Sequence, residues 1–437
     1  MEITKIRKRD GSVQSFTLDK IIHAVTKALH ETNEGGRDDA ERVAETVHQK
    51  VVAMCVAAQT AEPDTELAQK CVDGNPTVEE IQDLVEEGLM ELDFYATAKA
   101  YILYRNERKK MRERDLFRKR TNLKPYEYPE LVEYVDAIRH SYWIHTEFNY
   151  TSDVHDFKVN VTDAERDAIK KTMLAIAQIE VAVKVFWGDI YKKMPKPEIG
   201  AVGFTFAESE VRHMNAYSHL LEILGLNDDF KTITDVPVMQ ERINYLEQVI
   251  SLSKTEEDRE YALAVLLFSL FIEHVSLFSQ FLIMMSFNKH KNLFKGISNA
   301  VEATSKEEQI HGMFGIDLIN LIRDEHPEWF DDSMRARVEE MCFEAFEAEG
   351  HVVDWIFEKG EMDVLPKAVV KEFIKYRLNN SLKSIGFKPV FDIDEDMVAE
   401  TDWFDNEVIA TKHVDFFQKR SINYNKRSSS VTSADLF

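Results

Sequence analysis

Two copies of a Glu-x-x-His phrase constrain the fold of this chain more than any other feature. One copy pairs Glu210 with His213, and the other pairs Glu308 with His311. A glutamate and a histidine with this spacing lie on the same face of a helix, so each phrase can present one carboxylate and one imidazole to a single point. Two such helices facing each other predict a site for two metal ions.

Two lone glutamates complete this pattern, because each lies in an apolar stretch where an unpaired charge would be unfavourable. Glu180 lies in the run that continues through residue 186, and Glu273 lies in the stretch 261–285. In bundles of the ferritin-like carboxylate type, two helices carry Glu-x-x-His and two carry a lone glutamate. The chain therefore supplies six candidate metal ligands in bundle order: Glu180, Glu210, His213, Glu273, Glu308 and His311.

The donor types favour iron or manganese over structural zinc, because they are carboxylates and imidazoles without a thiolate. Cys55, Cys71 and Cys342 form no C-x-x-C pair, so we expect neither a disulfide framework nor a thiolate metal site. A reducing, cytoplasmic setting fits this cysteine usage, and the N-terminus lacks the apolar segment of a signal peptide. The formal net charge of −24 argues against nucleic acid or an anionic membrane as a partner.

The expected fold class is an all-α ferritin-like bundle preceded by a small α+β domain. Glycine and proline are scarce, 15 and 10 among 437 residues, which favours long helices. The stretch 261–285 is long enough to cross a bilayer, but Glu273 and His274 at its centre favour a buried bundle helix. Periodicity and caps predict a β-hairpin over 3–14 and helices over 18–30, 38–58, 78–108, 162–186, 204–224, 235–253, 261–285, 295–323, 333–359 and 366–382.

Three separated pieces near the N-terminus, 6–11, 16–21 and 98–105, resemble the ATP-cone, the regulatory nucleotide-binding module of ribonucleotide reductases. The resemblance implies ATP and dATP as allosteric effectors. It matches Lys8, Arg9 and Lys20 to basic positions that approach the phosphates, places Ile6 beside the base, and matches Lys99 less closely. Lysine and arginine suit this role because they form charge-assisted bonds with phosphate. Taken alone, the same basic cluster would predict only a solvated strand edge.

From Trp143 onward the chain resembles the radical-generating small subunit of class I ribonucleotide reductases. The resemblance implies that a dimetal centre supplies an oxidant to a separate catalytic (large) subunit. It matches Tyr217 to the family's radical tyrosine and Trp143 to the tryptophan of the radical-transfer route. Glu307 stands where an aspartate usually links the metal-bound histidine to that tryptophan, and Tyr424 is the candidate for handing the radical to the partner.

The same resemblance implies a homodimer, and we expect dATP to drive a higher oligomer through the ATP-cones. Four regions follow. Residues 1–105 form the ATP-cone, and 106–131, rich in charge, form a linker or a solvated helix extension. Residues 132–400 form the dimetal bundle, and 401–437 form a polar tail that binds the catalytic subunit.

Besides Glu307, the first ligand and its surroundings depart from the commonest members of that family. The first ligand is Glu180 instead of an aspartate, and Lys184 follows one turn later in an apolar run. Lys184 is either a partner for the Tyr217 hydroxyl or a stem that reaches solvent. A cation beside that phenol would make its oxidation harder, which resembles the subgroup with a dimanganese centre and no stored tyrosyl radical. We therefore predict two manganese ions; the alternatives are two iron ions with a Tyr217 radical, or a mixed Mn/Fe pair.

A different class of function is also open at this point. Two carboxylate helices and two Glu-x-x-His helices would serve a ferritin-like metal store or a stand-alone dimetal oxidase equally well. Trp143, Tyr424 and the fused nucleotide module argue against storage. The discriminating observation is whether activity requires a second protein.

Overall fold

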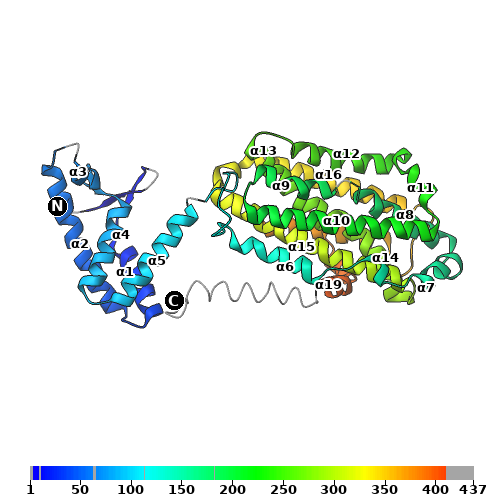
Figure 1. Ribbon diagram of the computed structural model, residues 1–437, viewed down its shortest axis with the longest axis horizontal. Helices are drawn as coiled ribbons and strands as arrows, with labels where there is room; N and C mark the ends of the chain where they lie inside the picture. Colours follow the sequence, from blue (N-terminus) through cyan, green and yellow to red (C-terminus); the bar gives the residue numbers. More distant parts are fainter. Residues whose placement is uncertain (1–2, 9–10, 63–64, 113, 182, 410–437) are drawn as a thin grey trace. The chain divides into compact units, whose positions relative to one another are not determined.

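The computed structural model describes residues 3–8, 11–62, 65–112, 114–181 and 183–409, and Figure 1 shows their ribbon. These residues form two compact units, the first ending at Arg114 and the second beginning at Asp115. Arg9 and Tyr424, two of the predicted site residues, lie outside the described residues.

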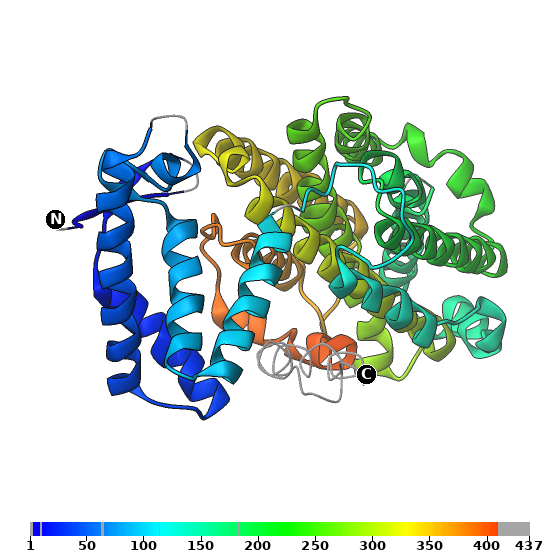
Figure 2. The ribbon, with the colours of Figure 1, turned by 60° about the vertical axis from the view of Figure 1, so that its left-hand side comes forward.

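The first unit is a small α+β domain. Its strands β1 (Lys5–Arg7) and β2 (Val13–Ser15) pair antiparallel, which confirms the predicted hairpin. The other elements are α1 (Leu18–Thr32), α2 (Arg37–Thr60), α3 (Glu66–Lys70), β3 (Cys71–Val72), β4 (Asn75–Pro76), α4 (Val78–Glu91) and α5 (Tyr95–Arg112). Figure 2 shows α2, α4 and α5 side by side in that order, and α1 packs on α2 and α5. Apolar residues at helical spacing, such as Val43, Val47 and Val51 of α2, fill the core between them.

The single helix predicted over 78–108 is wrong, because the structure divides this range into α4 and α5. The chain reverses at Asp93, which has a left-handed φ of 64°. The carboxylate of Glu34 then accepts hydrogen bonds from the backbone N–H groups of Ala96 (3.1 Å) and Thr97 (2.7 Å) in the first turn of α5. These N–H groups would have no partner inside the helix, so a distant carboxylate stabilises a second helix start that the local sequence does not announce.

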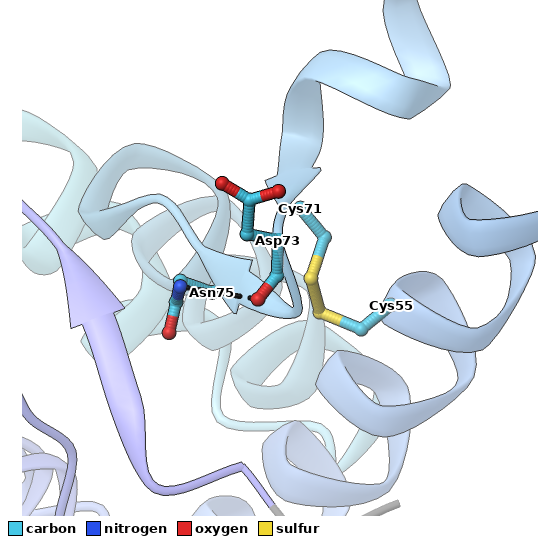
Figure 3. Close-up of a disulfide and its surroundings, with 4 residues drawn as sticks. All are labelled: Cys55, Cys71, Asp73 and Asn75. Carbon is cyan, nitrogen blue, oxygen red and sulfur yellow. Dashed lines mark hydrogen bonds between the residues drawn. A yellow bond between two sulfur atoms is a disulfide. The ribbon is translucent and has the colours of Figure 1, made fainter. Parts of the chain in front are cut away.

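The expectation of no disulfide is also wrong, because Cys55 of α2 and Cys71 of β3 are bonded (Figure 3). Their Cα atoms lie 5.2 Å apart although the residues are 16 apart in sequence. The two-residue turn between β3 and β4, Asp73 and Gly74, has positive φ at both positions and folds the chain back toward α2. An Asp-Gly pair is a typical hairpin signal, but the sequence analysis did not predict this hairpin. Cys342 is a free, buried thiol.

The second unit is a helical bundle whose long helices run roughly along one direction in Figure 1. Its α-helices are α6 (Glu133–His140), α7 (Thr151–His155), α8 (Asp163–Ile179), α9 (Val183–Lys193), α10 (Pro197–Leu224), α11 (Asn227–Lys231), α12 (Pro237–Leu252), α13 (Asp258–Leu267), α14 (Phe278–Lys291), α15 (Lys295–Glu325), α16 (Asp332–Ile356), α17 (Lys367–Ser384), α18 (Glu395–Ala399) and α19 (Asp402–Ile409). Short 3-10 turns are η1 (Pro129–Val132), η2 (His145–Glu147), η4 (Ile233–Asp235) and η6 (Pro327–Trp329), and π-helical segments are η3 (Asp156–Asn160) and η5 (Phe268–Ser276).

Several sequence signals position these helices as expected. Thr162 and Glu165 form the predicted capping box at the start of α8, Pro237 occupies the first turn of α12, and Gly225 ends α10 in the left-handed conformation. The stretch that raised the membrane question forms one span, Asp258–Lys291, of which 94% of the most apolar window is buried inside the unit. It is therefore a core helix of the bundle.

Two of the predicted helices are interrupted at metal-ligand positions. The run predicted to continue from 162 to 186 stops at Ile179, and Glu180 lies at the end of α8, before α9 begins. The long apolar helix changes to the π-helical segment η5 around Glu273. The range 106–131 is also divided, because its first part continues α5 whereas Leu116 and Tyr128 are fully buried in the second unit.

Candidate metal centre

The structure brings all six predicted ligands together in the interior of the bundle. Each is at most 2% exposed. One group of ligand atoms joins Glu210, Glu273, Glu308 and His311, and a second joins Glu180, His213 and Glu308, with the atoms of each group within 4.8 Å of one another. Glu308 belongs to both groups, so it is placed to bridge two cations.

Unpaired polar atoms in this cluster face one another. Among the described residues, both carboxylate oxygens of Glu180, both of Glu210, and Oε1 of Glu308 have no hydrogen-bond partner. His213 Nδ1 lies 3.0 Å from Glu308 Oε1, and His311 Nδ1 lies 3.0 Å from Glu210 Oε1, but neither contact has the direction of a hydrogen bond. Buried carboxylate oxygens without partners are unfavourable. A donor set of this kind fits divalent cations that prefer oxygen and imidazole ligands.

The pKa shifts of the clustered side chains are also consistent with a cation site. Burial raises the pKa of Glu180 and of Glu273 well above the ordinary value. Burial opposes the charged form of His213 and of His311, but the surrounding carboxylates outweigh it and raise both pKa values. Burial likewise opposes ionisation of Glu308, but the two histidines outweigh it and lower its pKa. Protons thus occupy the cluster when no cation does, and metal binding would release them.

His213 has a charged partner on the side away from the cluster. Its Nε2 lies 2.7 Å from Oε2 of Glu307, which is fully buried. Arg212 binds the same carboxylate with two N–H groups, at 3.1 and 3.2 Å. A carboxylate in this position fixes the orientation of a metal-ligating imidazole and raises its basicity. Sequence reasoning missed Arg212. The feature that could have identified it is the presence of an arginine on the inward face of an apolar helix.

Trp143 packs directly on this histidine. It is 4% exposed, and its ring stacks on the His213 ring with centroids 5.9 Å apart and planes 21° apart. Its indole Nε1 has no hydrogen-bond partner among the described residues. The expected connection from Glu307 to Trp143 therefore does not use the indole N–H: Arg212 binds Glu307 and also donates to the backbone oxygen of Trp143, at 3.0 Å.

The other half of the cluster has neutral outer partners. Ser209 Oγ lies 3.0 Å from Nε2 of His311, and the Trp187 indole N–H donates to Oε1 of Glu273 at 3.0 Å. The Phe206 ring lies 4.2 Å from the His311 ring. Sequence reasoning missed both hydrogen-bonding residues: Ser209 directly precedes Glu210, whereas Trp187 lies beyond the helix break and carries no local signal.

The π-helical segment that carries Glu273 is held by two buried arginines. Arg377 Nε donates to the backbone oxygen of His274 at 2.8 Å, and Arg242 donates to that of Ser276 at 2.5 Å. A π-helical segment displaces the regular backbone hydrogen bonds of an α-helix, so buried carbonyls near it need other donors. These arginines supply such donors from α12 and α17, far away in the sequence.

The predicted pairing of Lys184 with the Tyr217 hydroxyl is wrong. Lys184 Nζ donates to the backbone oxygens of Val181 at 2.7 Å and of Glu180 at 3.3 Å. The break after α8 leaves carbonyls without helical partners, and an ammonium group satisfies them. Tyr217 is 1% exposed and donates instead to Thr304 Oγ1 at 3.2 Å. Burial, followed by the charge of Glu180, raises the pKa of the Tyr217 phenol above its ordinary value.

A second candidate site is a cavity of about 180 Å³ in the first unit. Among the predicted nucleotide-binding residues, Ile6, Lys8 and Lys20 line it. Lys99 is exposed on α5 and is not among the lining residues. The remaining wall is mostly apolar and comes from β2, α1, α4 and α5. Two lysines at the mouth of an apolar slot suit a ligand that has a flat ring and an anionic group.

Two family models match the chain, one in each unit. The family model described as ribonucleotide reductase, small chain, matches residues 120–397, and that of the ATP cone domain matches 4–110. The probable ribonucleoside-diphosphate reductase small subunit of Invertebrate iridescent virus 3 is 26% identical over 324 residues, which cover 71% of this chain and 85% of that protein. The vitamin B12-dependent ribonucleoside-diphosphate reductase of Thermoplasma acidophilum is 40% identical over 116 residues, which cover 25% of this chain and 13% of that protein.

A solved structure has a similar fold. The crystal structure titled dimanganese(II)-NrdF, from Streptococcus sanguinis, superposes with a TM-score of 0.56 at 18% identity and covers 67% of this chain and 100% of that one. The small-chain match spans more than half of the sequence and includes all six ligands of the buried cluster. The chain therefore belongs to the ribonucleotide reductase small-chain family and carries an ATP cone domain in its N-terminal unit.

Proposed function

We propose that the buried cluster of this ribonucleotide reductase small subunit binds two manganese ions, with two iron ions or a mixed Mn/Fe pair as the alternatives. The observation that carries the proposal is the set of six buried candidate ligands joined through Glu308, with several carboxylate oxygens that have no hydrogen-bond partner among the described residues. When bound, such a pair of ions supplies the oxidising equivalent that the catalytic subunit uses to reduce ribonucleotides. Hard oxygen donors with imidazoles and no thiolate are compatible with both metals.

The surroundings of Tyr217 favour an oxidant that is not stored on this residue. A phenol that loses an electron also has to lose its proton, and it needs a base within hydrogen-bond reach. The Tyr217 hydroxyl contacts the Thr304 hydroxyl, which itself donates to the backbone oxygen of Ala300 at 2.9 Å. A serine- or threonine-type hydroxyl is a poor base. Lys184 plays no part here, because its ammonium group binds the backbone oxygens of Val181 and Glu180.

Metal analysis combined with EPR tests this proposal. Full-length protein loaded with manganese is expected to support turnover with the catalytic subunit, and Tyr217→Phe is expected to retain that activity. Tyr245→Phe provides a matched control, because Tyr245 is a buried tyrosine of α12 outside the cluster. A tyrosyl signal over two irons that Tyr217→Phe abolishes and Tyr245→Phe preserves would contradict the manganese assignment.

We also propose that the oxidising equivalent leaves through His213 and Trp143. The stacked rings provide contact for electron transfer, while Glu307 Oε2 holds the proton of His213 Nε2. Arg212 donates hydrogen bonds to the Glu307 carboxylate and to the backbone oxygen of Trp143, so it holds these two residues close to each other. From Trp143 the equivalent would reach Tyr424 in the tail and then the catalytic subunit. Family membership favours this role over a ferritin-like metal store or a stand-alone oxidase.

For the first unit, we propose that ATP and dATP bind in the cavity lined by Ile6, Lys8 and Lys20. The support is the combination of two cationic side chains with an apolar slot at the position where the ATP cone domain matches. The double change Lys8→Ala with Lys20→Ala is expected to abolish dATP inhibition of the holoenzyme. Lys99→Ala serves as the control, because Lys99 does not line the cavity; equal losses in both variants would contradict the assignment.

The remaining partner proposals concern assembly and location. We propose a homodimer that works in the cytoplasm with the large catalytic subunit and that forms a higher oligomer through its cones when dATP binds. An effector can shift such an equilibrium only by binding one assembly more tightly than the other. Sedimentation of the full chain with ATP and with dATP is the direct measurement, and identical profiles would contradict the dATP-driven assembly.

A further inference from the structure

We propose that Cys55 and Cys71 form a redox-controlled site, whose oxidation state sets how tightly the first unit holds its nucleotide. The inference rests on the proposed binding of ATP and dATP in the cavity near β1. It starts from the observation that the bond joins α2 to β3, and thus joins a long core helix to the hairpin beside the cavity.

The segment between the end of α2 and Cys71 has little buried surface. None of its described residues, 61–62 and 65–70, is buried. The short helix α3 contains no buried residue. Both cysteines, by contrast, are buried, at 0% and 5% exposure. Because burial of apolar groups is the main source of local stability, the buried disulfide is an important attachment of this segment, alongside the packing of α3 and β3 on α2.

A short chain of contacts connects Cys71 with the wall of the cavity. Cys71 pairs with Pro76 across the hairpin, and the backbone oxygen of Lys70 accepts a hydrogen bond from the Thr77 N–H at 3.2 Å. Thr77 caps α4 by accepting the Glu80 N–H at 3.3 Å, and it forms a parallel bridge with Arg7 of β1. Arg7 lies between Ile6 and Lys8, which both line the cavity.

α4 forms the facing wall of the same cavity. Its residues Val78, Ile81 and Val85 line the slot, and Val78 directly follows the Thr77 cap. Each strand of the β3–β4 hairpin is only two residues long, and so short a pair has little stability of its own. Loss of the covalent anchor would therefore loosen the hairpin, the start of α4 and the position of β1 together.

The chemistry of the switch is a thiol–disulfide exchange. A dithiol reductant gives two electrons and two protons: the Cys55–Cys71 sulfur–sulfur bond breaks, two thiols form, and the reductant becomes a disulfide. A reductant can reach the buried bond by local opening around Cys71, since the segment that precedes Cys71 has no buried residue among its described residues. Conversion of a ribonucleotide to a deoxyribonucleotide also consumes two electrons. Control by thiol reductants would thus link nucleotide inhibition to the supply of reducing equivalents.

The test compares dATP binding by the oxidised and the dithiothreitol-reduced full chain, with thiols counted in denaturant. One thiol is expected in the oxidised chain, from Cys342, and all three in the reduced chain. Reduction is expected to weaken dATP binding at least about fivefold, in the range typical of coupled sites. Cys55→Ser with Cys71→Ser should match the reduced protein and no longer respond to dithiothreitol. Cys342→Ser, which changes the free thiol of the other unit, should respond like the wild type.

A second measurement does not depend on the folding of the serine variant. Because coupling between two sites is reciprocal, saturating dATP should shift the equilibrium between disulfide and dithiol toward the disulfide by the same factor, as measured in a dithiothreitol redox titration. Equal dATP affinity in the two redox states would overturn the inference and leave nucleotide binding intact. A thiol count that stays at one under native reducing conditions would also overturn it. Failure of both redox states to bind dATP would overturn the nucleotide site itself.

Discussion

The two histidines of the metal cluster come from the same sequence phrase but have different surroundings. His213 contacts the ionisable Glu307, which is bound by Arg212, and its ring stacks on Trp143. His311 contacts the neutral hydroxyl of Ser209 and an aromatic wall that includes Phe206. His213 thus contacts charged and aromatic groups, whereas His311 contacts a neutral hydroxyl and an aromatic ring.

Two identical Glu-x-x-His phrases therefore do not produce two identical halves of the site. The i, i+3 spacing places the metal-facing atoms, but the atoms on the other side of each imidazole depend on which helix packs there. A charged outer partner can hold or accept a proton during electron transfer, and a neutral hydroxyl cannot do so as readily. The proposed exit of the oxidant on the His213 side depends on this asymmetry, and the following changes test it.

The largest effect is expected for the ligand that the two halves share. Glu308→Ala removes a carboxylate from both groups, so the metal content after loading should fall from two ions per chain to less than one. Turnover with the catalytic subunit should fall at least about 100-fold, since even outer contacts of metal ligands are worth 10–100-fold. Glu302→Ala is the control, because Glu302 lies on the same helix in a peripheral pair with Lys306. Retention of both ions by Glu308→Ala would contradict the shared role.

The next change distinguishes the two halves directly. Glu307→Gln keeps the shape of the side chain but removes the charge beside His213, so turnover should fall about 10–100-fold while the metal content stays near that of the wild type. Ser209→Ala removes one neutral hydrogen bond beside His311, worth about 1 kcal/mol or roughly fivefold. Both are measured by turnover and metal analysis on the same preparations. Equal losses in the two variants would show that the halves are equivalent.

A smaller effect is expected from pH in protein stripped of metal. The carboxylates outweigh burial and raise the pKa of His213 and of His311, so their stabilisation is complete below the ordinary value of 6.5 and is lost as the pH rises through the folded-state pKa. Burial raises the pKa of Glu180 and of Glu273, which gives the same sign above 4.5. The melting temperature of EDTA-treated protein should therefore fall as the pH rises above 6.5, by roughly 2 °C or more.

Metal-loaded protein should behave in the opposite way, because its ligands must be deprotonated and binding strengthens as the pH rises. The comparison of loaded and stripped protein at each pH separates this cluster from the other titrating groups. A melting temperature of stripped protein that rises with pH would show that the histidines are not held protonated by the carboxylates.

The smallest effect is expected for Lys184. Lys184→Met keeps the apolar stem and removes bonds to two backbone oxygens at the end of α8, a loss of about 1 kcal/mol or less in the free energy of unfolding. Metal content and the EPR spectrum should not change. Lys192→Met is the reference, because that lysine makes only a surface ion pair with Asp189. A new tyrosyl signal in Lys184→Met would instead support a pairing of Lys184 with Tyr217, which the structure does not show.

The ligand set was predictable because it depends on local geometry. Glu210 with His213 and Glu308 with His311 share helix faces whatever the tertiary structure is, and the apolar stretches around Glu180 and Glu273 indicated burial. The hairpin near the N-terminus and the caps at Thr162 and Gly225 were predictable for the same reason.

The interruptions at the ligands were not predictable from these patterns. The residues on both sides of Glu180 and Glu273 are mostly apolar and continue the helical pattern, so periodicity favours continuous helices there. The π-helical segment η5 is compatible with burial only because Arg242 and Arg377, from other helices, bind its carbonyls. The break after α8 likewise has Lys184 to satisfy its free carbonyls.

The sequence alone thus determined the helical character of the bundle, the six candidate ligands and the kind of cation that they suit, because helix periodicity and donor chemistry act over a few neighbouring residues. The tertiary structure was needed to show that Arg212 binds the Glu307 carboxylate behind His213, that Tyr217 contacts Thr304, and that Cys55 is bonded to Cys71. Each of these contacts joins residues that are distant in sequence. Their approach depends on how whole elements pack, which no local pattern of residues encodes.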